Sequence, residues 1–303
     1  MNIPVRSKIP DMWGNFEFVK SEWGSLNYLV GPNGGGKTRF AEAVRPQLHI
    51  AQLLPRYLSA ERLMGFERHS QAFGFGTPLS QGLNIGEFSH LQLFGEQQGL
   101  SADALIILKQ RLNVRIKVET FLSSIIGRRI RLAEEGGFLN PKVRRIIGGE
   151  EYSLKQAECH GLKELTSLLA FLYDDKYNCL IIDEPELHLH PQFQSFLVQE
   201  ARRMSGDPRK NPAKKCFFFI THSPYFLDFR TVDELRDCIL FQPQKPPTFV
   251  DTLEEQDEFL LKRFLPRLNT HHKQFFFSDR PVFVEGYTDQ QLFTLIQESR
   301  NNF

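Results

Sequence analysis

The stretch GPNGGGKT, residues 31–38, constrains the fold of this 303-residue chain more than any other feature. It fits the pattern G-x-x-x-x-G-K-[ST] of a phosphate-binding loop. An apolar, strand-like run precedes it at residues 26–30, and a helix-like run follows from Arg39 and is expected to stop at Pro46. A strand, a glycine-rich turn and a helix in this order predict an α/β fold of the P-loop type.

The residue types of this loop suit phosphate recognition. Glycines allow a tight turn that points backbone N–H groups at phosphate oxygens, and the following helix N-terminus adds partial positive charge. We expect Lys37 to contact the β- and γ-phosphates of ATP and Thr38 to ligate Mg²⁺. The loop residues expected to bind ATP are Gly31, Pro32, Asn33, Gly34, Gly35, Gly36, Lys37 and Thr38.

Composition limits the compartment and the partners. The net charge is +1, so the chain as a whole is not attracted to nucleic acid or to a membrane. It has no apolar run long enough to cross a membrane, and its N-terminus lacks the apolar core of a signal peptide, so we expect a cytoplasmic protein with no membrane partner. The cysteines form no CxxC pair and predict reduced, buried thiols; they are Cys159, Cys179, Cys216 and Cys238.

A second motif follows the apolar, strand-like residues 178–182. Asp183 and Glu184 come at the end of this strand, where ligands bind in parallel α/β sheets. We expect Asp183 to hold Mg²⁺ through water and Glu184 to activate the attacking water as a general base. The alternative is a helix start with acids in its first turn, and Pro185 after an uninterrupted apolar strand argues against it.

The next apolar strand, residues 216–221, ends at His222. A histidine at this position is expected to contact the γ-phosphate of ATP and to respond to its presence, and a purely structural histidine is the alternative. The aromatic runs at residues 217–219 and 275–277 both predict buried strands.

Two short segments with alternating polarity, residues 128–132 and 142–147, predict a hairpin whose connection is longer than two residues. Both are basic. A solvated face is the simpler interpretation, and contact with a DNA backbone is the alternative. Other expected elements are strands at 16–20, 53–59 and 238–241, helices at 101–126, 161–173, 192–204 and 254–265, an irregular stretch at 65–86 and a turn or linker at 243–247.

Three motifs in this order, GPNGGGKT, LIIDEPELHLHP (residues 180–191) and FFFITHSPYFL (residues 217–227), resemble an ABC-type ATPase. The branch that they resemble includes RecF and the OLD (overcoming lysogenisation defect) proteins, and the likeness covers residues 16–245. It implies a head with a mixed sheet flanked by helices and a small helical lobe, at about residues 87–127. It also implies a head-to-tail homodimer or higher oligomer, in which ATP lies between two heads and a signature loop of one subunit contacts the nucleotide of the other.

The signature loop departs from the family pattern. Gly161 is the residue that the resemblance places against the partner's nucleotide, but His160 stands where the family has serine. The family's Q-loop glutamine has no counterpart at residues 59–62. These departures leave open an ATP-binding scaffold with negligible turnover.

Residues 275–293, FFFSDRPVFVEGYTDQQLF, resemble the junction at which OLD proteins pass from the ATPase to a Toprim domain. The resemblance implies an ATPase domain at 1–273, the beginning of a Toprim-like segment at 274–303, and Mg²⁺ ligands at Glu285 and Asp289. A terminal strand and helix that only complete the fold are the alternative. Because no Asp-x-Asp pair follows, we expect this chain alone not to cleave nucleic acid.

The resemblance implies an ATP-hydrolysing subunit of an OLD-like, anti-phage nuclease system. The chain is then either a fragment of a longer nuclease or a subunit that works with a nuclease partner. A RecF-like DNA-repair ATPase without nuclease activity is the rival prediction. DNA is a candidate partner in both.

Overall fold

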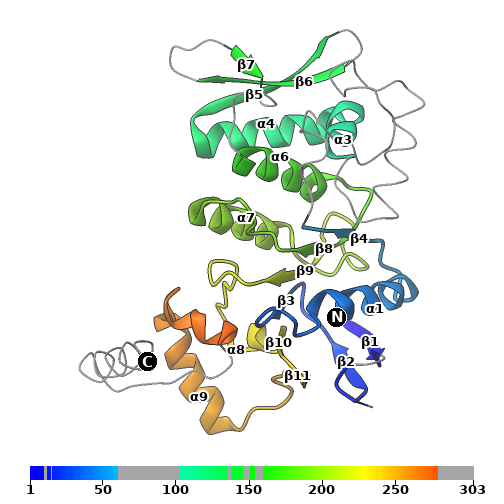
Figure 1. The fold of residues 1–303 in the computed structure, drawn as a ribbon, viewed down its shortest axis with the longest axis vertical. Coiled ribbons are helices and arrows are strands. Elements are labelled where there is room, and N and C mark those ends of the chain that lie inside the picture. Colours follow the sequence, from blue (N-terminus) through cyan, green and yellow to red (C-terminus); the bar gives the residue numbers. More distant parts are fainter. Residues whose placement is uncertain are drawn as a thin grey trace, which may run out of the picture.

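The structure is a computed structural model that describes residues 1–9, 12–14, 16–60, 103–135, 138–145, 151–153 and 160–278 (Figure 1). Its strands are β1 (Asn2–Ser7), β2 (Phe18–Glu22), β3 (Leu26–Val30), β4 (Pro55–Leu58), β5 (Arg128–Glu135), β6 (Phe138–Arg145), β7 (Glu151–Ser153), β8 (Cys179–Asp183), β9 (Cys216–Thr221), β10 (Cys238–Gln242) and β11 (Lys245–Phe249). Its helices are α1 (Lys37–Ile50), α3 (Ala104–Gln110), α4 (Leu112–Ile126), α6 (His160–Tyr173), α7 (Pro191–Met204), α8 (Val232–Leu235), α9 (Glu255–Phe264), η3 (Leu265–Arg267) and η4 (His272–Phe277).

A six-stranded sheet in the order β11-β10-β3-β9-β8-β4 forms the centre of the molecule. All neighbouring strands are parallel except β10 and β11, which are antiparallel. Strands β3, β8 and β9 are buried along their whole length, as their uninterrupted apolar sequences require. Because they are parallel neighbours, their carboxyl ends meet at one edge of the sheet, where we expect the ligand.

Alternation along the strands gives this sheet a core on each face. One face packs against the helices α6 and α7 through residues that include Tyr28, Leu180 and Phe219. The other packs against α1 and the β1–β2 hairpin through residues that include Leu29, Ile181 and Phe218. The predicted fold class, an α/β head with a mixed sheet flanked by helices, is confirmed.

A helical layer lies beyond α6, and the small sheet β5-β6-β7 lies beyond that layer at one end of the molecule (Figure 1). Helices α3 and α4 both pack on α6, and β5 packs on α4. The helix predicted at 101–126 is two helices, because the chain becomes extended at Arg111 (φ −115°, ψ 90°). The first part of the predicted helical lobe, residues 87–102, and the predicted irregular stretch at 65–86 lie outside the described residues.

One prediction about a proline is wrong, and another holds in part. Helix α1 does not stop at Pro46 but continues to Ile50. Glu42, whose carbonyl loses its usual N–H partner, and Pro46 are both exposed, while Val44 and Leu48 are buried on the core side, so packing outweighs the lost hydrogen bond. Of the two alternatives predicted for the proline-rich residues 243–247, a turn or a linker, the turn holds at residues 243–244, between β10 and β11. Residues from Lys245 onward form β11, an edge strand where proline is tolerated.

Two other expectations need correction. Residues 275–277 are part of the 3₁₀ helix η4 and not a buried strand; Phe275 and Phe276 stack on each other (ring centroids 4.2 Å apart) and Phe276 lies against Phe229. The hairpin strands β5 and β6 run to Glu135 and from Phe138, so their connection is two residues long and not longer. Backbone pairing of β5 with β6 continues beyond the alternating segments, to Glu135 in β5 and back to Phe138 in β6.

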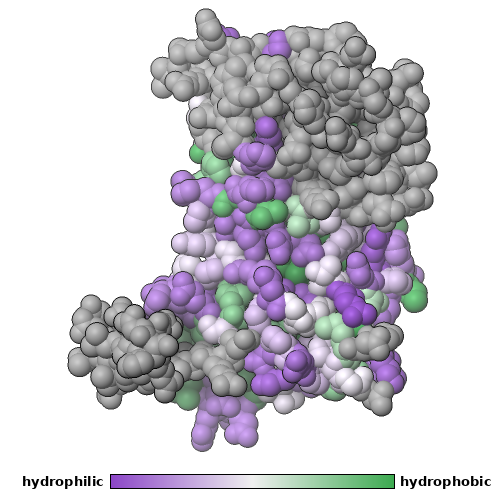
Figure 2. Space-filling model, in the orientation of Figure 1, coloured by the Kyte–Doolittle hydropathy of each residue, from purple (hydrophilic) through white to green (hydrophobic). Residues whose placement is uncertain are grey.

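The surface and the cysteines agree with the composition. None of the helices in the described part of the chain is both long and apolar enough to cross a membrane. The described surface in Figure 2 is mostly hydrophilic, with apolar residues scattered over it. Cys179, Cys216 and Cys238 are free, buried thiols, as predicted, and Cys159 lies outside the described residues.

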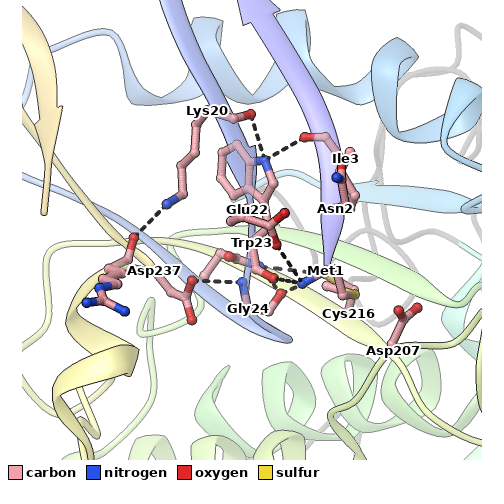
Figure 3. A network of polar contacts seen from close by, with 12 residues as sticks. Met1, Asn2, Ile3, Lys20, Glu22, Trp23, Gly24, Asp207, Cys216 and Asp237 are labelled. Atoms are coloured by element: carbon pink, nitrogen blue, oxygen red, sulfur yellow. Dashed lines mark hydrogen bonds and ion pairs between the residues drawn. The ribbon is translucent and has the colours of Figure 1, made fainter. Parts of the chain in front are cut away.

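A polar network joins the β1–β2 hairpin to the central sheet (Figure 3). The indole N–H of Trp23 donates to the carbonyls of Ile3 and Lys20, at 3.0 and 3.2 Å. The Asp237 carboxylate accepts the Gly24 N–H at 2.7 Å, just before β3 begins. This network holds β3, and therefore the loop that follows it, against β10.

The Asp237 carboxyl should make stability depend on pH. Burial raises its pKa from 3.8 to about 6, against the Gly24 N–H and Lys20, which lower it. The folded chain therefore holds this proton more tightly than the unfolded chain between these values, and the carboxyl's contribution to stability falls as pH rises through the window. Asp237→Asn keeps an acceptor for the Gly24 N–H. We expect its melting temperature to exceed that of the parent by an amount that grows as the pH rises through this range. Above this range the difference should grow little further.

The control for this prediction is the exposed Asp251→Asn. Thermal unfolding of the three proteins from about pH 4 to about pH 8 measures the effect. A difference between Asp237→Asn and the parent that does not grow with pH contradicts it.

Candidate nucleotide-binding site

The phosphate-binding loop connects β3 to α1 at the edge where the parallel strands end. Gly31 has φ +134° and Gly36 has φ +93°, conformations that favour glycine. A Cβ at Gly31 would also lie 2.0 Å from the Phe241 carbonyl oxygen in β10. Gly36 is the N-cap of α1 and supplies no side-chain acceptor, so the first N–H groups of the helix are available to an anion.

The Lys37 side chain binds the backbone of this loop. Its ammonium donates to the Gly31 and Pro32 carbonyls, at 2.9 and 2.8 Å, and the residue is only 5% exposed. Burial lowers the pKa of Lys37 to about 8, and the carboxylates of Asp183 and Glu184 act against this shift. A charged ligand with several oxygens could take the place of the two carbonyls and would favour the protonated amine.

Asp183 and Thr38 form a pair of hard oxygen ligands. The Thr38 hydroxyl donates to Asp183 Oδ2 at 3.0 Å, and the Tyr57 hydroxyl in β4 donates to the same atom at 2.7 Å. Mg²⁺ is commonly held by one or two protein oxygens together with phosphate and water. The residues present therefore fit Mg²⁺, with Thr38 and Asp183 as the groups that would hold it.

Glu184 begins the loop after β8 in a strained conformation. Its φ is +45°, which costs about 1–3 kcal/mol for a residue other than glycine. Its N–H donates to the Ile220 carbonyl at 2.8 Å, which maintains this conformation and ties the loop to β9. The side chain is 38% exposed and one carboxylate oxygen lies 4.0 Å from His222 Nε2. The Glu184 carboxylate is therefore accessible to water and lies near the histidine, as is suitable for a base that activates a water molecule.

His222 follows β9 directly and is half-buried. Burial lowers its pKa, the Lys37 ammonium lowers it further, and Asp183 acts in the opposite direction. The imidazole is therefore biased toward its neutral form, in which it can accept or donate a hydrogen bond at a phosphate.

One pocket of about 380 Å³ brings these residues together. The structure places Asp183, Glu184 and His222 around it, together with loop residues. Those loop residues are Asn33, Gly34, Gly36, Lys37 and Thr38. Met12 and Arg39 also line the pocket, and nothing in the sequence pattern singled them out. A side chain at Gly36 would collide with Met12, since a Cβ there would lie 2.3 Å from the Met12 methyl carbon.

Sequence reasoning also missed Glu186. Its carboxylate accepts the Thr221 hydroxyl at 2.8 Å and the His222 backbone N–H at 2.6 Å. Burial raises the pKa of Glu186, while these hydrogen bonds lower it. Ser223 continues the network, because its hydroxyl donates to Gln194 Oε1 at 2.6 Å. The repeated acid in Asp-Glu-Pro-Glu was the available signal, and it links the loop after β8 to the histidine after β9.

Gly161 and His160 do not line this pocket. Gly161 is buried in the first turn of α6, and a Cβ there would lie 2.6 Å from the His188 carbonyl oxygen of the same chain. His160 is exposed at the start of α6. Glu285 and Asp289 lie outside the described residues, so the Toprim-like site stays a prediction.

Known proteins resemble parts of this chain. The family described as "AAA domain, putative AbiEii toxin, Type IV TA system" matches residues 159–228. An OLD nuclease of Thermus scotoductus is 29% identical over 133 residues, which is 41% of this chain and 24% of that protein. The predicted resemblance to an OLD-like ABC ATPase is confirmed for the ATPase part.

The chain has an ABC-like P-loop ATPase fold related to OLD nucleases. It spans only about a quarter of the OLD nuclease that it matches. Solved structures with distant similarity include the SMC head domain from Thermotoga maritima, with 12% identity and a TM-score of 0.43 over 80% of this chain and 96% of that one. Another, from work on ATP-driven dimerization and DNA-stimulated activation of SMC ATPases, has 13% identity and a TM-score of 0.36 over 54% of this chain and 97% of that one.

Glu186→Ala tests whether the carboxylate positions His222. The substitution leaves the Thr221 hydroxyl and the His222 N–H without their acceptor, so we expect a loss of about 1–3 kcal/mol in unfolding free energy. The freed imidazole should become more hydrated, and its pKa should rise toward the usual value, as measured by NMR titration of the ring signals.

Glu186→Gln is the matched control. Its amide oxygen can still accept the His222 N–H, so the titration of His222 should stay close to that of the parent. An unchanged His222 titration in Glu186→Ala contradicts the positioning role, whatever the loss of stability.

Proposed function

We propose that this chain binds and hydrolyses ATP as part of an OLD-like nuclease system of anti-phage defence, in which two ATPase heads associate head to tail and gate a Toprim-type nuclease. The observation that carries the ATPase part is the single pocket around which Lys37, Thr38, Asp183, Glu184 and His222 lie. The similarity to an OLD nuclease supports the link to a nuclease system. The defence role rests on the family resemblance alone.

The residues divide the reaction between them. Lys37 and the N–H groups of the loop bind the phosphates, and Thr38 and Asp183 hold Mg²⁺, which supplies charge neutralisation on the phosphate oxygens. Glu184 accepts the proton of the attacking water. His222, 4.0 Å from the Glu184 carboxylate, contacts the γ-phosphate side of the pocket. Glu186 keeps His222 in place.

Glu184→Gln tests the assignment of the base. The amide keeps the shape and can still hydrogen-bond the water, but it cannot accept a proton. We expect ATP binding to be retained and the rate of phosphate release to fall by about 10²–10⁴-fold. Calorimetry and a phosphate-release assay measure the two effects.

Glu42→Gln is the matched control, because this exposed acid lies on α1 close to the loop. It should hydrolyse ATP at the parent rate. Parent-like turnover in Glu184→Gln means that another group is the base.

Two inactive variants test the composite site when they are mixed. Lys37→Ala removes the phosphate-binding charge but leaves α6 intact. Gly161 is unsuitable as the second position because a side chain there collides with His188 of its own chain. His160→Glu is cleaner: the residue is exposed, and an acid at a helix N-terminus suits the fold while it repels a partner's phosphate.

A heterodimer of the two variants contains one intact site, so the mixture should recover part of the ATPase activity. Each variant alone should be inactive. If tagged chains show that heterodimers form and activity does not recover, ATP is not held between subunits as proposed.

A further inference from the structure

The outermost sheet carries cations on one face. Strands β5 and β6 are antiparallel, and their register sets Arg129 directly opposite Arg144 and Arg131 directly opposite Lys142. Directly opposite residues share a face, and so do residues two apart along a strand. These four residues, which we call the basic ladder, therefore lie on one face of the hairpin.

The ladder faces away from the core. Val143, which alternates with the ladder residues, is completely buried, and β5 packs on α4. Arg129, Arg131 and Arg144 are exposed, and Lys142 is half-buried. In Figure 1 this sheet lies at the end of the molecule opposite α9, beyond α4 and α6 as seen from the central sheet.

This arrangement is unfavourable for the isolated chain. Like charges directly opposite each other destabilise a sheet. Within the described part of the chain, Arg129, Arg131 and Arg144 make no ion pair.

We propose that the basic ladder binds the sugar-phosphate backbone of duplex nucleic acid. The two rungs are about 7 Å apart along the strands, and duplex DNA carries about four phosphate charges over that length. The ladder presents four cations. Three of them are arginines, whose planar forks can donate two hydrogen bonds to one phosphate. Contacts of this kind position a duplex without reading its sequence.

The chemistry of the face favours nucleic acid over a lipid surface. Segments that bind membranes combine cations with exposed aromatic or aliphatic side chains that enter the headgroup region. The ladder positions hold only Arg and Lys, and the apolar residue between them, Val143, is buried toward α4. A face on which these four positions are all cationic matches a phosphate backbone.

The ladder is separate from the nucleotide pocket. None of its residues lines the pocket, so the inference goes beyond the proposed ATPase reaction and does not depend on it. Substitutions in the ladder should leave the ATPase rate without nucleic acid unchanged, which distinguishes failure of one proposal from failure of the other.

The test measures binding of the full chain to a fluorescein-labelled DNA duplex by anisotropy over a salt series. The slope of log K against log salt changes by about 0.9 for each phosphate contact. Replacing the three exposed arginines, Arg129, Arg131 and Arg144, with Gln should make the slope shallower by about 3 and weaken binding by more than about tenfold. Each single replacement, which disturbs the fold least, should change the slope by about 0.9.

The matched control replaces three exposed cations elsewhere, Arg6, Lys210 and Arg267, with Gln, for the same change in total charge. It should keep the parent's slope. The proposal is overturned if the parent does not bind the duplex, if ladder and control variants lose affinity equally, or if the single variants keep the parent slope. Ladder-dependent binding to phosphatidylserine vesicles without binding to the duplex also overturns it.

Discussion

The parallel pairing of β3, β9 and β8 is the constraint on which the rest of the structure depends. Tyr28 lies opposite Phe219, and Phe219 lies opposite Ile182, so the three strands end at the same level. The loop after β3, the acids after β8 and the histidine after β9 must then emerge at one edge. A shift of the pairing register would reverse the faces of buried strands and separate these groups at the same time.

Hydrogen bonds between loops convert this common edge into a site. The Thr38 hydroxyl joins the phosphate loop to Asp183, and the Glu184 N–H joins the loop after β8 to the Ile220 carbonyl. Glu186 joins the same loop to the His222 backbone. These bonds tie the ends of β3, β8 and β9 together. The bond from the Glu184 N–H to Ile220 helps to hold Glu184 in a conformation that it would otherwise avoid. The parallel sheet, which fixes the strand ends, thereby stabilises both the strained backbone of Glu184 and the position of the buried Glu186 carboxylate.

The cation of the nucleotide pocket and the cations of the basic ladder differ in their burial and in how their charge is compensated. In the pocket, Lys37 is buried and its ammonium is satisfied by backbone carbonyls of its own loop, so its charge acts at short range. In the ladder, Arg129 faces Arg144 in open solvent with no ion pair in the described residues. A buried, satisfied cation suits a specific ligand, whereas a row of exposed cations suits an extended polyanion.

The sequence by itself determined which motif residues meet at the edge of the sheet, because the residue types and their strand-end positions follow from local pattern. The loop from Gly31 to Thr38, the Asp183–Glu184 pair and His222 were all identifiable in this way. Tertiary structure alone decided what those residues touch. The contact of Tyr57 with Asp183 and the contact of Glu186 with His222 join strands that are far apart in sequence, and no local pattern records them. Packing likewise decided that α1 continues past Pro46, since burial of a helix face outweighs one lost hydrogen bond.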